Sequence, residues 1–163
     1  MIEYARDLPP GRALDLACGS GSDAIWLAER GWQVTAVDRS AELIARLKLA
    51  SPAVDAPVAD LERHEFSIRE NEWDLILMSN YLQRDLFEPV KRGLCPGGIA
   101  IVTVHLFEPG HETSRFSLRP NELAGYFSDW VVLHSREGKP VHNSQGRAVA
   151  EIVARKPSLP DGL

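Results

Sequence analysis

The chain alternates short apolar runs with segments in which apolar residues recur every three or four positions. The apolar runs predict β-strands, and the segments of helical period predict the helices between them. Strands are expected near residues 12–17, 33–37, 54–58, 73–79, 98–105, 130–136 and 147–155. Helices are expected near residues 22–30, 40–50, 84–93 and 120–127. This alternation predicts a doubly wound α/β fold, in which right-handed crossovers join parallel strands.

The last two predicted strands have no helix between them. The loop from Gly138 to Gly146 is therefore expected to join them as a hairpin, which makes one strand antiparallel to the others. The sequence thus predicts a Rossmann-like, mostly parallel, seven-stranded sheet with one antiparallel strand near the C-terminus and helices on both faces. We expect a single domain over residues 1–156, with a shortened N-terminal segment, and a flexible tail over residues 157–163.

A glycine-containing turn over residues 17–21 follows the first predicted strand. Gly19 and Gly21 lack a Cβ and adopt positive φ readily, so backbone N–H groups in this turn can approach a ligand closely. Asp38 ends the second predicted strand, where a carboxylate can accept hydrogen bonds from both ribose hydroxyls. The order of strand, glycine turn, helix, strand and acid predicts a site for an adenine nucleoside cofactor.

Two cofactors fit this unit. Residues 19–24 satisfy the loose dinucleotide pattern, and Asp38 follows about 20 residues later, so NAD is one candidate. Asp15 lies just before the turn and favours S-adenosylmethionine instead. A carboxylate at the mouth of the turn would repel a pyrophosphate, but it would attract the ammonium of a methionyl group.

The same residues resemble the class I S-adenosylmethionine-dependent methyltransferases. Residues 15–21 are similar to the first motif of that family, with Ala17 in place of its first glycine, and Asp38 matches its ribose acid. Further segments that resemble family motifs are residues 59–61, 73–80 and 94–98. The resemblance extends from about residue 11 to residue 156 and implies S-adenosylmethionine as the cosubstrate.

Two other stretches, residues 79–87 and 116–123, resemble the small tellurite-resistance-type branch of this family. Proteins of that branch are single domains thought to methylate small or soft nucleophiles. The resemblance therefore implies in-line transfer of a methyl group to a small-molecule acceptor. A noncatalytic S-adenosylmethionine-binding module and an NAD-dependent oxidoreductase are the alternatives.

The expected cofactor-binding residues follow the strand ends, because ligands of such sheets lie beyond the carboxyl ends of the strands. These residues are Asp15, Ala17, Gly19, Ser20, Gly21, Asp38, Arg39, Asp60, Leu61 and Asn80. The resemblance places Arg39 beside the adenine, and it gives Asp60 and the next backbone N–H to the adenine amino group and a ring nitrogen. For Asp38 the alternative is an N-cap or turn residue, and for Asp60 it is a solvated acid in a turn.

His105 ends the fifth predicted strand, near where the methyl group should emerge. A histidine can act as a general base for an amine or hydroxyl acceptor, whereas a soft anion such as a thiolate needs none. The alternative is a loop histidine bonded to the backbone. The candidate substrate contacts are Tyr81, His111 and Arg115, the last two for an anionic acceptor. Ordinary packing of Tyr81 and a solvated loop around the other two are the alternatives.

The composition narrows the range of partners. The chain has 163 residues, which is near the usual size of one domain, and its net charge is −5. This charge disfavours nucleic acid or an anionic membrane, since binding phosphates requires a basic patch. No apolar run approaches the roughly 18 residues of a membrane span, and residues 1–7 have no signal-peptide pattern. We expect a cytoplasmic protein without a metal, and a homodimer stays an open alternative.

Overall fold

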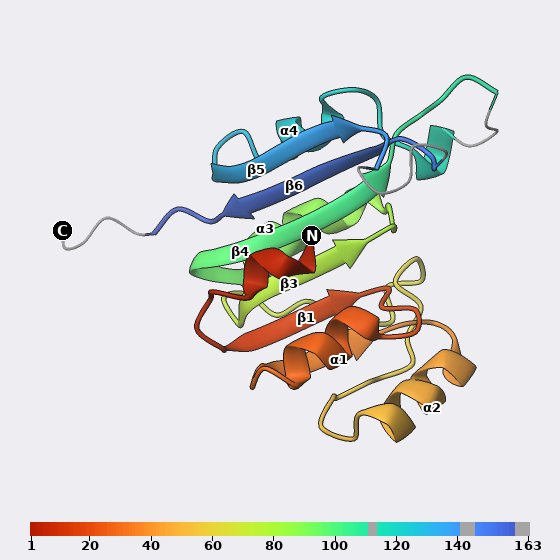
Figure 1. The fold of residues 1–163 in the computed structure, drawn as a ribbon, viewed down its shortest axis with the longest axis vertical. Helices are drawn as coiled ribbons and strands as arrows, with labels where there is room; N and C mark the ends of the chain where they lie inside the picture. The colour runs from red at the N-terminus through yellow and green to blue at the C-terminus, as the bar shows by residue number, and fades with distance from the viewer. Residues whose placement is uncertain (111–113, 141–145, 159–163) are drawn as a thin grey trace.

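A computed structural model describes residues 1–110, 114–140 and 146–158. Its centre is a six-stranded sheet with the strand order β2-β1-β3-β4-β6-β5 (Figure 1). The strands are β1 (Arg12–Leu16), β2 (Gln33–Val37), β3 (Trp73–Ser79), β4 (Leu94–His105), β5 (Val131–Gly138) and β6 (Val149–Arg155). The pairs β1–β2, β1–β3 and β3–β4 are parallel, whereas β6 is antiparallel to both β4 and β5. The expected Rossmann-like, mostly parallel sheet with one antiparallel strand is therefore confirmed.

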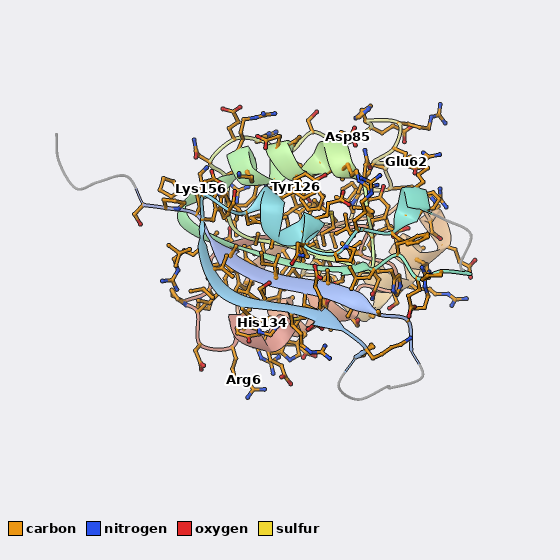
Figure 2. The ribbon with its side chains drawn as sticks, turned by 90° about the horizontal axis from the view of Figure 1, so that it is seen from above. Arg6, Glu62, Asp85, Tyr126, His134 and Lys156 are labelled. Carbon is orange, nitrogen blue, oxygen red and sulfur yellow. The ribbon has the colours of Figure 1, made fainter. Side chains whose placement is uncertain are left out.

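Helices cover both faces of this sheet (Figure 1). The α-helices are α1 (Ser22–Ala28), α2 (Ala41–Ala50), α3 (Phe87–Gly93) and α4 (Glu122–Tyr126), and the 3-10 turns are η1 (Ile2–Ala5), η2 (Arg84–Leu86) and η3 (Ser114–Phe116). Leu27 of α1 and Ile44 of α2 belong to one apolar cluster, and Phe87 of α3 and Leu123 of α4 belong to a second one. Figure 2 shows the two faces from above, with Tyr126 on one and His134 on the other.

The prediction of a strand over residues 54–58, the third of the seven expected strands, is wrong. This segment runs parallel to β2, but it forms only isolated bridges at Asp55 and Val58. The N–H of Asp55 donates a hydrogen bond to a carbonyl of β2. The N–H of Ala59 donates one to the carbonyl of Asp38, the residue that follows β2. Pro57 stands between these two donors and has no N–H to continue the ladder. The segment therefore still brings the residues that follow it beside the end of β2.

The N-terminal segment forms the single turn η1 before β1. Ala5 is buried in the same apolar cluster as α1 and α2. The ring of Tyr4 lies 5.2 Å from the ring of His134 on β5. Across the described ranges, no helix is both long and apolar enough to cross a membrane.

Candidate functional site

Three residues in the left-handed region shape the turn after β1. Ala17, Gly19 and Gly21 have φ values of 55°, 55° and 76°. Glycine adopts such values freely, whereas a residue with a Cβ loses roughly 1–2 kcal/mol, so Ala17 is strained. A Cβ on Gly19 would meet no atom within 4 Å, but one on Gly21 would lie 2.6 Å from the methyl groups of Leu47. Gly19 therefore borders open space, and Gly21 lets α1 pack closely on α2.

Asp38 connects this turn to the end of β2. Its Oδ2 accepts a hydrogen bond from the backbone N–H of Gly19 at 2.9 Å, and its Oδ1 accepts one from Ser40 at 2.8 Å. Asp38 is therefore a turn-stabilising acid, as its alternative interpretation required. Each carboxylate oxygen can accept more than one hydrogen bond, so the side chain keeps acceptor capacity for a ligand.

Asp15 is buried beneath the turn, with 2% of its surface exposed. It lies in the central strand β1, which is paired on both sides. Its pKa is raised from 3.8 to about 8, chiefly by burial and then by the charges of Asp23 and Asp38, while a bond from the N–H of Ala24 acts in the opposite direction. Asp15 is therefore largely protonated at neutral pH, and its contact with an ammonium group stays a prediction.

A cavity of about 360 Å³ opens beside the turn, which is a volume suited to a small ligand. Its walls are formed by Ala17, Asp38, Arg39, Ala59, Asp60, Leu61, Glu62, Asn80, Tyr81 and Phe116. The structure thus brings together most of the expected cofactor residues and the expected substrate residue Tyr81. Asp15, Gly19, Ser20 and Gly21 are not among the wall residues.

The wall residues after β3 are bonded to those that follow Pro57. The Tyr81 hydroxyl donates to Oε1 of Gln83 at 2.7 Å, and the Gln83 amide donates to the carbonyl of Leu61 at 3.1 Å. Burial is the main cause that raises the pKa of Tyr81 to about 12, so this hydroxyl keeps its proton. Asp60 accepts a hydrogen bond from the N–H of Glu62 at 2.9 Å, so it stabilises a turn while it lines the cavity.

His105 lies at the end of β4, opposite Val149 of β6, and is not a wall residue of this cavity. Its Nδ1 is buried without a hydrogen-bond partner among the described residues. Burial lowers the pKa of the imidazole, the charge of Arg147 lowers it further, and Glu108 opposes them. The ring is therefore neutral near pH 7 and able to accept a proton, and its role as a base stays a prediction.

A second cavity of about 790 Å³ borders η3. Its walls are formed by Arg84, Phe107, Arg115, Ser117, Arg119, Pro120, Asn121 and Glu122. The expected substrate residue Arg115 thus lies in this cavity, and its guanidinium is also 3.4 Å from the carboxylate of Glu62. The other expected substrate residue, His111, lies outside the described residues.

Three wall residues of the first cavity were missed by sequence reasoning: Ala59, Glu62 and Phe116. Ala59 is the first residue of the segment 59–61 that resembles a family motif but was not chosen as a contact, and extending that segment by one residue would have found Glu62. Phe116 begins the stretch 116–123 that resembles the tellurite-resistance-type branch, but that resemblance does not indicate its place in the cavity, which it reaches from a distant segment after β4.

Comparisons with known proteins agree with this geometry. Residues 13–98 match the methyltransferase domain family. The chain is 35% identical over 108 residues to the putative methyltransferase YqeM of Bacillus subtilis, which covers 58% of the chain and 42% of that protein. It is 25% identical over 149 residues to the probable S-adenosyl-L-methionine-dependent methyltransferase TehB of Haemophilus influenzae, which covers 84% of the chain and 52% of the relative.

The comparison with solved structures agrees with these sequence comparisons. The crystal structure of TehB from Haemophilus influenzae superposes with a TM-score of 0.81 at 24% identity, over 95% of this chain and 60% of that one. The expected resemblance to the tellurite-resistance-type branch is thus confirmed. The chain spans about half the length of the curated relatives it matches.

Proposed function

Because the chain belongs to the methyltransferase domain family, we propose that it transfers a methyl group from S-adenosylmethionine to a small-molecule acceptor. The observation that carries this proposal is the placement of Asp38. This carboxylate lines the cavity while two backbone N–H groups fix both of its oxygens. A carboxylate held rigidly at the end of the second strand is suited to accept hydrogen bonds from ribose hydroxyls.

The cavity has the chemistry that the cosubstrate requires. The space beside Gly19 accepts atoms that a Cβ would exclude, and the cavity volume of about 360 Å³ suits a nucleoside. Asp60 and the N–H of Leu61 would hold the adenine, and Arg39 would lie beside it. Bound S-adenosylmethionine supplies an electrophilic methyl group, whose bond to sulfur breaks as a lone pair of the acceptor attacks in line. Methyl transfer then depends chiefly on alignment and on the exclusion of water.

The remaining cofactor roles complete this assignment. Asp15 would lie nearest the methionyl ammonium, whose positive charge would favour its ionised form. The cofactor backbone would lie along Ala17, Gly19, Ser20 and Gly21, and Asn80 would contact the cofactor at the end of β3. The left-handed conformation of Asn80 is one that asparagine adopts more readily than most residues.

The acceptor side would comprise Tyr81, His105 and Arg115, together with His111. A neutral His105 can take the proton that an amine or hydroxyl acceptor must lose, whereas a soft anion needs no base. The arginines around the second cavity would favour an acceptor that carries negative charge. The net charge of −5 supports a small molecule over nucleic acid. A single domain with a short tail, a cytoplasmic location and a homodimer stay predictions.

The test is calorimetry with S-adenosylhomocysteine and NADH on the wild type and on Asp38→Ala. We expect binding of S-adenosylhomocysteine in preference to NADH, and a loss of about 30- to 150-fold in the variant, since such charged hydrogen bonds contribute about 2–3 kcal/mol. The exposed acid Asp7 provides the control substitution Asp7→Ala, which should leave affinity unchanged.

Two outcomes would reject parts of this proposal. A preference for NADH would reject S-adenosylmethionine as the cosubstrate. An unchanged dissociation constant in Asp38→Ala would reject the assignment of Asp38 to the ribose. Release of S-adenosylhomocysteine from S-adenosylmethionine is then measured with amine, hydroxyl and thiol acceptors. Tight binding without turnover on any of them would favour the noncatalytic module.

A further inference from the structure

Phe116 is a large apolar residue that remains 46% exposed in the wall of the first cavity. Among the described residues, it is the one wall residue that lies after β4 in the chain. Its neighbours Arg115 and Ser117 line the second cavity instead. The turn η3 therefore lies between the two cavities and contributes one aromatic ring to the first.

The backbone of η3 is held firmly at this position. Arg84 donates hydrogen bonds to the carbonyls of Arg115 and Ser117 at 3.2 and 3.0 Å. The guanidinium of Arg84 is itself fixed by two bonds to the carboxylate of Glu122, at 2.7 and 3.2 Å. The Ser117 hydroxyl also accepts a bond from Arg147 at 3.2 Å. The exposure of Phe116 is thus a property of a well-bonded turn.

One contact places η3 against the expected adenine motif. Nη2 of Arg115 lies 3.4 Å from Oε1 of Glu62, which directly follows Asp60 and Leu61. Figure 2 shows Glu62 at the end of the molecule where η3 lies. The guanidinium carbon of Arg115 is also 5.2 Å from the centre of the Phe116 ring. The ring therefore lies on the side of the cavity that the adenine motif borders.

We propose that Phe116 binds the adenine of the cosubstrate by packing its ring against the base. This inference rests on the proposed function, since it requires S-adenosylmethionine in the first cavity. An aromatic ring stacks on the π-face of a base, and a base that covers it removes apolar surface from water. The exposed surface of Phe116 would then become buried when the ligand binds.

The experiment measures affinity for three probes: S-adenosylmethionine, S-adenosylhomocysteine and adenosine. The variants are Phe116→Ala, Phe116→Tyr and the control Phe107→Ala. Phe107 is a matched control because it is 45% exposed and follows β4 in the same segment, but it lines the second cavity. Circular dichroism and the unfolding midpoint establish that each variant keeps its fold.

We expect Phe116→Ala to weaken all three probes by about tenfold, within the range known for base–aromatic stacking. Phe116→Tyr should retain the wild-type affinity, and Phe107→Ala should change it less than twofold. Unchanged affinity in Phe116→Ala would overturn this inference alone. A loss confined to S-adenosylmethionine would also overturn it, because the ring would then contact the sulfonium. A wild type that binds none of the probes would overturn the proposed function and this inference together.

Discussion

Replacing Asp15 with asparagine should stabilise the folded protein at neutral and alkaline pH. Asp15 is 2% exposed, and its pKa is raised from 3.8 to about 8, chiefly by burial and then by the charges of Asp23 and Asp38. Asparagine has the same shape, can accept the same bond from the N–H of Ala24, and never has to ionise. The substitution therefore removes the cost of keeping this carboxyl protonated on folding and leaves the packing intact.

The magnitude follows from proton linkage. Between about pH 4 and pH 8 the folded chain holds the Asp15 proton while the unfolded chain has released it, so wild-type stability falls as pH rises. The stabilisation that Asp15 contributes to the folded protein is fully present below the unfolded pKa of 3.8. It is lost as the pH rises to the folded pKa of about 8. The slope is about 1.4 kcal/mol per pH unit, so raising the pH from 5 to 7 should cost the wild type about 3 kcal/mol relative to Asp15→Asn.

Urea unfolding followed by circular dichroism at pH 5, 6, 7 and 8.5 measures this difference. Subtracting the wild-type free energy of unfolding from that of Asp15→Asn cancels the titration of the groups that do not interact with Asp15. The difference should grow with pH up to about 8 and then level off. The substitution Asp7→Asn at an exposed position is the control and should leave the difference flat. If the two stability profiles of the wild type and Asp15→Asn run parallel between pH 5 and 7, the folded-state pKa of Asp15 is not raised.

The remaining predictions concern the turn after β1. Gly19→Ala should keep the fold at a cost of roughly 1–2 kcal/mol for its positive φ, since its Cβ meets open space, but calorimetry should show a large loss of S-adenosylhomocysteine affinity; wild-type affinity would place the ligand elsewhere. Gly21→Ala should lower the free energy of unfolding by about 2 kcal/mol or more, because its Cβ would lie 2.6 Å from Leu47; unchanged urea unfolding would contradict that packing. Ala17→Gly should raise the unfolding free energy by about 0.5–1 kcal/mol, since it removes left-handed strain at the expense of some chain entropy. A lower unfolding midpoint for that variant would refute the strain.

The succession of strands and helices along the chain and most of the cavity wall could be predicted from the sequence because both depend on local patterns. Each apolar run ends beside a polar residue, and parallel pairing brings those ends to one edge of the sheet. The one false strand, residues 54–58, also had a local signal. Pro57 lies within it, and a proline has no N–H to donate to a continuous ladder.

The parts that sequence reasoning missed depend on tertiary contacts. Phe116 reaches the first cavity only because the ion pair of Arg84 with Glu122 positions the carbonyls of η3. No motif near Phe116 encodes that contact. The burial of Asp15 could not be predicted from the sequence either, because an acid at a strand end can face a ligand or lie beneath the turn. The structure shows Asp15 buried, with a bond from the N–H of Ala24 in α1.

The two acids nearest the turn have opposite environments, and that difference bears on the choice of cofactor. Asp38 borders the cavity and accepts two backbone N–H bonds. Asp15 is buried nearby and largely protonated, chiefly because of its burial and then because the charges of Asp23 and Asp38 oppose its ionisation. A pyrophosphate would add negative charge to a region where the charges of Asp23 and Asp38 already oppose a further one. A cationic methionyl group would relieve that repulsion, so the electrostatics of the turn favour S-adenosylmethionine over NAD.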